Sequence, residues 1–290
     1  MKPPPFTYHA PASLAEALNL LRSCENARLL AGGQSLMPMM NMRYAQPEHV
    51  IDINNVPDLS YIREAGAWLE IGAMTRQREL EFSPLVAAKC PILRDAILHV
   101  GHRQTRNRGT IGGSLCHLDP AAELPLIAAL YDATIGIAGS SGAREARFSE
   151  FAQGFMTPGL GADEMVTAIR LPVWEDGARH GFVEFARRHG DFALAAAAVA
   201  MWIDQTGCIG RIAVAVGGVG PVPLRLAAAE SLLQGKAPSP ALFDEAAASC
   251  AVLEAMDDVH APASYRRHLA GVVLKRALAA AANNTRTIVA

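Results

Sequence analysis

The spacing of apolar residues predicts a mixture of helices and strands in the first part of the chain. Apolar residues between Leu14 and Leu21 recur every three to four positions, which is typical of one face of a helix, and Ser13 is suited to cap its start. The other helices predicted in this part span residues 75–80, 91–100 and 126–131. Shorter apolar runs bounded by turn residues predict strands. These strands span residues 28–31, 50–53, 68–73, 134–137 and 165–171.

The pattern changes after a charged, glycine-containing segment at residues 174–181, which we interpret as a domain boundary. The strands predicted beyond it span residues 182–185, 195–203 and 211–216. The second of these is rich in alanine, so its pattern fits a helix as well as a strand. The helices predicted at the end of the chain span residues 226–233, 241–253 and 265–282. Residues 283–290 are expected to form a loose tail.

Two glycine pairs interrupt these patterns about 80 residues apart. Gly32 and Gly33 end the first predicted strand, Gln34 and Ser35 add polar side chains, and a helix is expected from Leu36. Glycine tolerates backbone angles that a Cβ atom forbids, so such a pair predicts a tight turn. The first pair therefore lies in a strand–turn–helix unit.

The second pair, at residues 112–113, repeats this arrangement. Thr110 and Ile111 predict the end of a strand, and Ser114 adds a hydroxyl donor. A helix is expected to start near residue 119, where an aspartate precedes a proline. Two such turns suit a diphosphate held between two loops by backbone N–H groups and hydroxyls. The alternative is an ordinary corner without a ligand, because neither pair matches G-x-G-x-x-G or G-x-x-x-x-G-K-[ST].

Composition narrows the class of protein. The chain has 290 residues, 51% of them hydrophobic and 19% charged, which is enough for a sizeable globular core. Its formal net charge of -2 gives no reason to expect a nucleic acid or a membrane surface as partner. The longest uncharged apolar run, residues 192–203, is shorter than the ~20 residues of a membrane-spanning helix. The N-terminus lacks the apolar core of a signal peptide, so we expect a soluble, cytoplasmic protein.

The residues that usually hold metals or carry out acid–base chemistry are dispersed along the chain. The five cysteines are Cys24, Cys90, Cys116, Cys208 and Cys250. Their wide spacing disfavours a disulfide framework, a zinc ribbon and an iron–sulfur cluster. The nine histidines are scattered and no H-E-x-x-H motif occurs, so no metal site and no catalytic residue is predicted. Arg103, Arg106 and Arg108 form a basic cluster that is either a solvated surface or a contact to a cofactor or partner.

Two long segments carry a family resemblance. AGGQSLMPMMNMR at residues 31–43 and TIGGSLCHLDPAAELP at residues 110–125 together resemble the FAD-binding medium subunit of the molybdenum hydroxylases. This is the family of carbon monoxide dehydrogenase and xanthine dehydrogenase. Residues 106–109 and 187–193 add to the resemblance, which covers nearly the whole chain.

The resemblance implies an α+β fold in two domains. Residues 1–175 are expected to form a two-part FAD-binding domain of the PCMH (vanillyl-alcohol oxidase-like) type, divided into about 1–57 and 58–175. Residues 176–290 are expected to form a C-terminal domain of the carbon monoxide dehydrogenase flavoprotein type, an α+β domain with a small antiparallel sheet packed on helices.

The resemblance also implies which residues contact a non-covalently bound FAD. These are Leu29, Leu30, Ala31, Gly32, Gly33, Gln34, Ser35 and Leu36 in the first loop, Val100, Gly101, Thr110, Ile111, Gly112, Gly113 and Ser114 around the second, and Glu123 and Leu160. The two loops would enclose the diphosphate, with the Ser35 and Thr110 hydroxyls assisting the backbone. Glu123 stands where relatives often have an aspartate. A lysine often found near Ala186 is absent, and Arg187 is the neighbouring basic residue.

The implied function is the FAD subunit of a molybdenum-containing hydroxylase or dehydrogenase. A [2Fe–2S] small subunit and a molybdopterin large subunit are the expected partners, in a heterohexamer built as a dimer of heterotrimers. This chain would take electrons from the [2Fe–2S] subunit and pass them from FAD to an external acceptor. The substrate and the acceptor do not follow from the sequence.

Two alternatives remain open. A stand-alone FAD-dependent oxidoreductase of the same flavin fold would act directly on an alcohol or an amide-like substrate, and it predicts an acid–base pair that we do not find in the sequence. A cofactor-free interaction subunit would leave both glycine pairs without a role.

Overall fold

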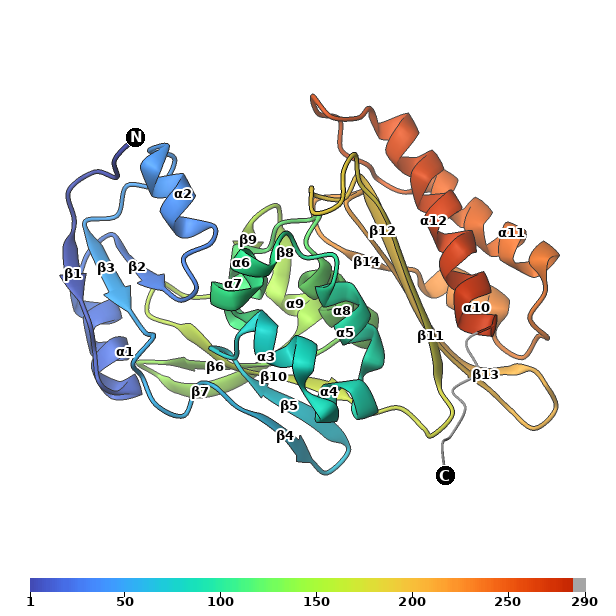
Figure 1. Cartoon of the computed structure of the whole chain (residues 1–290), viewed down its shortest axis with the longest axis horizontal. Coiled ribbons are helices and arrows are strands. Elements are labelled where there is room, and N and C mark those ends of the chain that lie inside the picture. The colour runs from blue at the N-terminus through green and yellow to red at the C-terminus, as the bar shows by residue number, and fades with distance from the viewer. Residues whose placement is uncertain (284–290) are drawn as a thin grey trace.

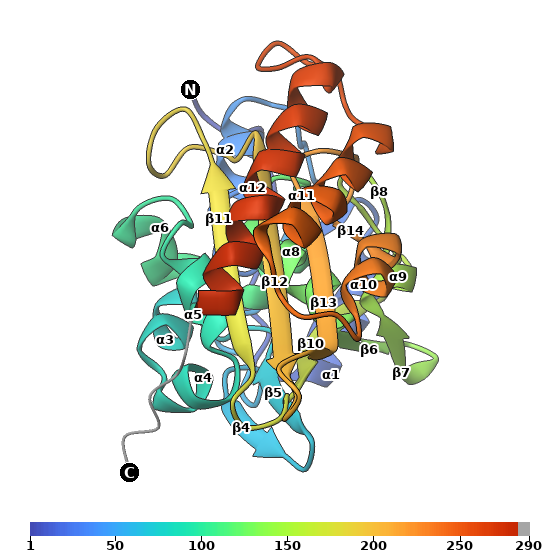
Figure 2. The ribbon, with the colours of Figure 1, turned by 90° about the vertical axis from the view of Figure 1, so that its right-hand side faces the viewer.

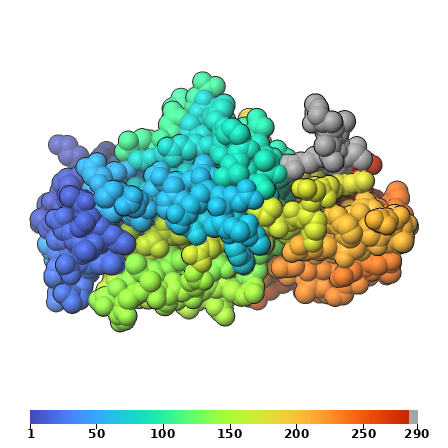
Figure 3. All heavy atoms as spheres, turned by 90° about the horizontal axis from the view of Figure 1, so that it is seen from below, coloured from blue at the N-terminus to red at the C-terminus, as the bar shows by residue number. Residues whose placement is uncertain are grey.

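The computed structural model describes residues 1–283, and in this range the chain forms three units in a row (Figure 1). Viewed from below, the N-terminal, middle and C-terminal parts occupy successive stretches of an elongated molecule (Figure 3). Of the tail predicted at residues 283–290, only Asn283 is described, and it ends the last helix. The rest of that prediction lies outside the described residues.

The N-terminal unit is a small parallel sheet with two helices. Its strands lie in the order β1–β3–β2. Their bounds are Thr7–His9 for β1, Ala27–Leu30 for β2 and His49–Asp52 for β3. The helices are α1, Leu14–Ser23, and α2, Leu36–Asn41. The predicted cap is confirmed, because the Ser13 side chain accepts a hydrogen bond of 3.1 Å from the Glu16 backbone N–H.

The middle unit combines an antiparallel sheet with a group of short helices. The sheet has the order β4–β5–β10–β6–β7. Its strands are β4 Ile62–Ala65, β5 Trp68–Gly72, β6 Thr134–Gly139, β7 Gly142–Arg147 and β10 Met165–Pro172. A two-stranded sheet, β8 Ala152–Gly154 and β9 Thr157–Pro158, lies beside it. The helices are α3 Gln77–Phe82, α4 Pro84–Lys89, α5 Pro91–Ile97, α6 Arg103–Arg108, α7 Ile111–His117, α8 Glu123–Tyr131 and α9 Phe148–Phe151.

Two helix starts in the middle unit differ from the predictions. Helix α3 starts at Gln77 with Arg76 as its cap, two residues after the start predicted at residue 75. Helix α8 starts at Glu123, beyond the aspartate–proline pair that we took as its start. The Asp119 carboxylate instead accepts a 2.9 Å hydrogen bond from the Ala121 backbone and holds a turn between two helices.

The C-terminal unit is an antiparallel sheet covered by helices, as the resemblance implies. The strands are β11 Arg179–Phe185, β12 Ala195–Ile203, β13 Ile209–Gly217 and β14 Leu224–Arg225, in sequential order. The helices are α10 Ala227–Leu233, α11 Pro240–Ala248, a 3₁₀ turn at Ser249–Val252 and α12 Ala263–Asn283. Figure 2 shows α12 and α11 lying across the outer face of this sheet. The fold is therefore α+β.

The alanine-rich segment forms strand β12 because both of its faces are buried. Ala196, Ala198 and Ala200 belong to the core shared with the helices of the middle unit. Their neighbours Ala195 and Ala197 belong to the core beneath α12. Since successive strand residues point to opposite faces, small side chains at all these positions let helices pack closely on both sides. The strand prediction is confirmed and the helical alternative is wrong.

No helix within residues 1–283 is both long enough and apolar enough to cross a membrane.

Candidate functional site

A cleft of ≈ 840 Å³ opens where the three units meet. One wall comes from the N-terminal unit and carries the first glycine pair. The facing wall comes from the helices of the middle unit, including α7 and the start of α8, and the loop between β11 and β12 contributes Gly190, Asp191 and Phe192. A volume of this size suits a large organic cofactor.

The structure brings most of the predicted site residues together in this cleft. From the first loop, the lining residues are Leu29, Ala31, Gly32, Gly33, Gln34, Ser35 and Leu36. From the rest of the prediction, they are Val100, Gly101, Thr110, Gly112, Gly113, Ser114, Glu123 and Leu160. Leu30 and Ile111 do not line it. Leu30 follows Leu29 in a strand and so points to the other face, and Ile111 is buried in the core of the middle unit.

The first glycine pair forms the predicted turn. Gly33 has φ +71°, in the left-handed region that favours glycine. Gly32 faces the backbone of the other loop so closely that a Cβ atom would lie 2.3 Å from the Arg108 carbonyl oxygen. Helix α2 follows, and the Ser35 side chain at its start makes no capping hydrogen bond. The two loops therefore touch, and the Ser35 hydroxyl is free to serve a ligand.

The second glycine pair does not form the turn that we predicted. Thr110 caps α7, and its hydroxyl oxygen accepts a 3.1 Å hydrogen bond from the Gly113 N–H. Gly112 therefore lies in the first turn of the helix, where a Cβ atom would lie 2.7 Å from Ala73. This close approach to the end of β5 requires a glycine. The strand predicted to end at Ile111 is wrong, because helix α7 begins at that residue. The first backbone N–H groups of α7 already have acceptors, because Ile111 donates a 3.1 Å hydrogen bond to the Thr75 carbonyl and Gly112 a 2.9 Å bond to the Ala73 carbonyl.

A buried polar atom on the cleft wall has no partner among the described residues. Gln77 is buried, and its Oε1 atom makes no hydrogen bond. Burying such an acceptor unpaired costs free energy, so a donor from a bound molecule would stabilise it. Gln77 was not predicted, because a glutamine in the first turn of a helix carries no sequence signal of its own.

Glu123 lies buried in the cleft opposite a second buried carboxyl group. Burial raises the pKa of Glu123 to about 8, and the nearby Glu184 on β11 adds to the rise. Burial also raises the pKa of Glu184 to about 7, and its Oε2 atom has no partner among the described residues. At neutral pH Glu123 is thus mainly a neutral acid that can donate a hydrogen bond.

A second hollow of ≈ 770 Å³ adjoins the cleft and shares Gly101, His102 and Thr105 with it. His99 lines this hollow, and its Nδ1 lies 3.9 Å from Glu184 Oε1. Burial lowers the pKa of His99, with His189 adding to the effect. The lowered pKa of His99 and the raised pKa of Glu184 both favour the uncharged forms of these side chains.

The predicted basic cluster divides into different roles. Arg106 is mostly buried, and its Nε donates a 3.0 Å hydrogen bond to Glu81 while an Nη donates a 3.1 Å bond to the Val100 carbonyl. It holds the segment before α6 against α3. Arg103 lines the adjoining hollow. The cluster is thus partly structural.

Several lining residues were not predicted. Phe192 is 69% exposed and belongs to the segment 187–193 that resembles the family, yet the resemblance assigned no contact there. Cys116 also lines the cleft, and burial raises the pKa of its thiol to about 12, so it stays protonated and unreactive.

The sequence predicted no metal site, yet the structure brings one group of possible ligand side chains together. His9, Cys24 and His49 are far apart in the sequence, but their ligand atoms lie within 4.8 Å of one another. None of them lines the cleft.

Comparisons with known proteins identify the same family along nearly the whole chain. Residues 4–174 match the family described as FAD binding domain in molybdopterin dehydrogenase, and residues 180–281 match the CO dehydrogenase flavoprotein C-terminal domain. The chain is 40% identical over 283 residues to the carbon monoxide dehydrogenase medium chain of Hydrogenophaga pseudoflava, covering 97% of this chain and 98% of that one. It is 37% identical over 286 residues to the nicotine 6-hydroxylase medium subunit of Paenarthrobacter nicotinovorans, covering 98% and 100%.

The fold of this chain is also similar to that of a solved structure. It is carbon monoxide dehydrogenase from Hydrogenophaga pseudoflava lacking the Mo-pyranopterin moiety of the molybdenum cofactor. One of its chains superposes with a TM-score of 0.93 and 41% sequence identity, covering 97% of this chain and 98% of that chain.

Proposed function

Because the chain belongs to the family of FAD-binding medium subunits of the molybdenum hydroxylases, we propose that it takes electrons from a [2Fe–2S] subunit and passes them to an external acceptor. The chain is an oxidoreductase subunit and its cofactor is FAD. FAD supplies the two-electron redox chemistry when bound, and the side chains position and tune it.

The observation that carries the proposal is the cleft between the two glycine segments. The unpartnered Gln77 oxygen offers a hydrogen-bond acceptor, and the Ser35 hydroxyl at the start of α2 offers a donor, within largely apolar walls. Such a lining fits a flavin dinucleotide, whose diphosphate needs donors, whose flavin ring can donate an N–H, and whose rings need apolar surface.

In this proposal, different residues contact different parts of the cofactor. The first loop, with Gly33 at its turn, and the second segment, with Thr110 as the cap of α7, hold the diphosphate. Val100, Gly101 and Leu160 line the flavin ring. Glu123, as a buried neutral acid, donates a hydrogen bond to the cofactor without adding a negative charge beside the diphosphate.

The partners and the larger assembly are part of the same proposal. Relatives are medium chains or subunits of several different enzymes, so a [2Fe–2S] small subunit, a molybdopterin large subunit and a dimer of heterotrimers are expected here. The substrate is oxidised on the large subunit. The proposal also includes the division into residues 1–57, 58–175 and 176–290, and the cytoplasm as the location, with which five free cysteines are compatible.

The test uses the purified full chain, first alone and then with its partners. Reconstitution should load a single FAD that acid precipitation releases, and the loaded chain alone should oxidise no organic substrate or carbon monoxide. Addition of the molybdenum and [2Fe–2S] subunits should allow substrate to bleach the flavin absorbance.

Three results would count against this function. Failure to bind FAD would overturn the assignment of the cleft, and colour that precipitates with the protein would contradict non-covalent binding. Rapid bleaching by an organic substrate with this chain alone would favour the stand-alone oxidoreductase.

A further inference from the structure

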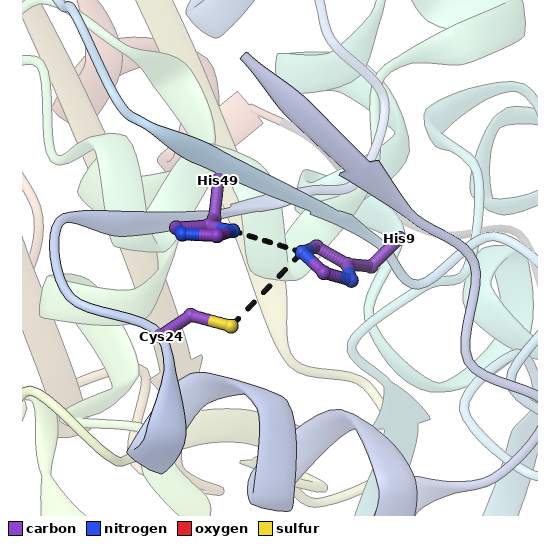
Figure 4. Close-up of side chains that lie close together, drawn as sticks. All are labelled: His9, Cys24 and His49. Atoms are coloured by element: carbon purple, nitrogen blue, oxygen red, sulfur yellow. Dashed lines mark hydrogen bonds between the residues drawn. The ribbon is translucent and has the colours of Figure 1, made fainter.

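His9, Cys24 and His49 converge at the small parallel sheet of the N-terminal unit (Figure 4). His9 ends β1 and His49 begins β3, while Cys24 is the residue that caps the C-terminal end of α1. The three side chains therefore come from three different elements. None of them takes part in the cofactor cleft.

The register of the sheet explains why the two histidines meet. In the parallel pair β1–β3, Thr7 lies opposite His49, and His9 follows Thr7 by two residues on the same face. Ile51 lies two residues after His49, and it packs in the core with Ala17 and Leu21 of α1. Helix α1 thus crosses this face, and its C-terminal end delivers Cys24 to the histidine pair.

The distances between ligand atoms are close to those of a metal site. His9 Nε2 lies 2.9 Å from His49 Nδ1 and 4.0 Å from Cys24 Sγ. A tetrahedral zinc ion with ordinary Zn–N and Zn–S bonds places its ligand atoms about 3.3–3.6 Å apart. Side-chain shifts of about 1 Å would bring the three atoms to those separations. All three side chains are half-buried, so solvent can reach a fourth position.

We propose that His9, Cys24 and His49 bind a zinc ion, with water as the fourth ligand. Two imidazole nitrogens and a thiolate are donors that zinc prefers, whereas magnesium and calcium prefer oxygen. On binding, the Cys24 thiol loses its proton to solvent, and each histidine presents an unprotonated ring nitrogen in place of the hydrogen bond between the rings. The site then links β1, the end of α1 and β3, so it stabilises the N-terminal unit.

The test is zinc binding to the tag-free full chain, titrated with zinc chloride against a competing chelator. The wild type should bind one zinc ion. Cys24→Ser and His49→Gln should each weaken binding roughly 100-fold or more, since even residues that only support a ligand contribute 10- to 100-fold. Cys208→Ser, which changes another half-buried free cysteine, should bind zinc like the wild type.

Two further readouts distinguish this site from weak zinc binding elsewhere on the surface. Cobalt substituted for zinc should give the intense absorption of a thiolate ligand, which Cys24→Ser should abolish. Zinc should raise the thermal midpoint of the wild type and of Cys208→Ser but not of the two ligand variants. The FAD content of each variant reports whether it is folded. If one ligand variant fails to fold, His9→Gln takes its place in the comparison.

The proposal is wrong if the folded ligand variants bind zinc as tightly as the wild type. It is also wrong if zinc leaves the thermal midpoint of the wild type unchanged. The three side chains would then form only a hydrogen-bonded structural cluster. Neither result bears on FAD binding, which depends on different residues.

Discussion

Single glycines in the cleft meet different physical requirements, although the sequence shows them as similar pairs. Gly33 requires a backbone conformation with φ +71°, which side chains disfavour. Gly112 lies in a regular helical turn and instead requires the absence of a Cβ atom next to Ala73. Only the first of these is a turn glycine, so only there does a substitution act directly on the conformation of a loop that lines the cleft.

Gly33→Val should weaken FAD binding roughly tenfold or more, because it strains the loop and adds a side chain beside Met37. Gly66→Val is the matched control. Gly66 also has a positive φ, +62°, but faces open space outside the cleft. Both variants should lose about 1–2 kcal/mol of stability from backbone strain. Fluorescence titration of FAD and thermal unfolding measure the two effects, and equal FAD affinity in both variants would refute the role of this loop.

The raised pKa of Glu123 predicts a pH dependence of stability. Its folded pKa of about 8 lies above its ordinary value of 4.5, so the folded chain keeps a proton that the unfolded chain releases. The stabilisation of the folded state by this proton is fully present below pH 4.5. It is lost as the pH rises towards 8, with a slope of at most about 1.4 kcal/mol per pH unit. Glu123→Gln should flatten this fall.

Urea unfolding of the flavin-free chain at pH 5 and pH 8 measures the effect. The stability of Glu123→Gln minus that of the wild type should be greater at pH 8 than at pH 5. Glu25→Gln, at an exposed position, should follow the wild type at both pH values. Identical pH dependence in wild type and Glu123→Gln would show that the carboxyl group does not hold its proton in the folded chain.

Between elements, Arg106 is a largely buried polar link from α6 to α3 and to the segment that carries Val100. Its side chain is 11% exposed, and its guanidinium donates hydrogen bonds to both Glu81 and the Val100 carbonyl. Glu81 is buried as well, and it also bonds Arg78 at the surface side. The interaction with Arg106 lowers the pKa of Glu81 despite burial, which marks it as a charged pair.

Arg106→Met should destabilise the chain by about 3 kcal/mol, the low end for a broken buried pair because Arg78 still neutralises Glu81. It should also shift the absorbance of bound flavin, since the Val100 segment loses its anchor. Arg78→Met removes a more exposed partner of the same carboxylate and should cost less than ~1 kcal/mol with an unchanged spectrum. A spectrum altered equally by both changes would contradict the anchoring role.

At the scale of the whole molecule, the cleft depends on how the C-terminal sheet docks against the middle unit. Gly217 of β13 packs against Leu126 of α8, and the Gly218 N–H donates a 2.7 Å hydrogen bond to the Pro120 carbonyl. Strand β12 faces the same helices with its even-numbered alanines. The loop that contributes Phe192 to the cleft leads into β12, which takes part in this contact between the units.

Ala198→Leu should loosen this docking, because Ala198 is fully buried on the face towards the middle unit. Ala197→Leu is the control, since Ala197 is equally buried on the opposite face, beneath α12. Each should lose about 1–3 kcal/mol through overpacking. Only Ala198→Leu should speed proteolysis between the units and weaken FAD binding, and equal protease sensitivity would contradict the assignment of faces.

The sequence by itself determined the local elements and the family. The period of apolar residues placed α1, β5, β10 and α12 within a few residues, since a helix face or strand face is set by neighbours three to four or two positions away. The two glycine segments were informative together because each is a long, continuous stretch of chain. The family resemblance that they carry implied the fold class, FAD and the oxidoreductase class.

The tertiary structure decided everything that depends on contacts across the chain. It made Gly112 a packing glycine through Ala73, turned the alanine-rich segment into a strand with two buried faces, and buried Glu123 beside Glu184. It also gathered His9, Cys24 and His49 at one point of the small sheet. Strand register and packing between distant elements set these contacts, and neither is encoded in the spacing of residues along any one segment.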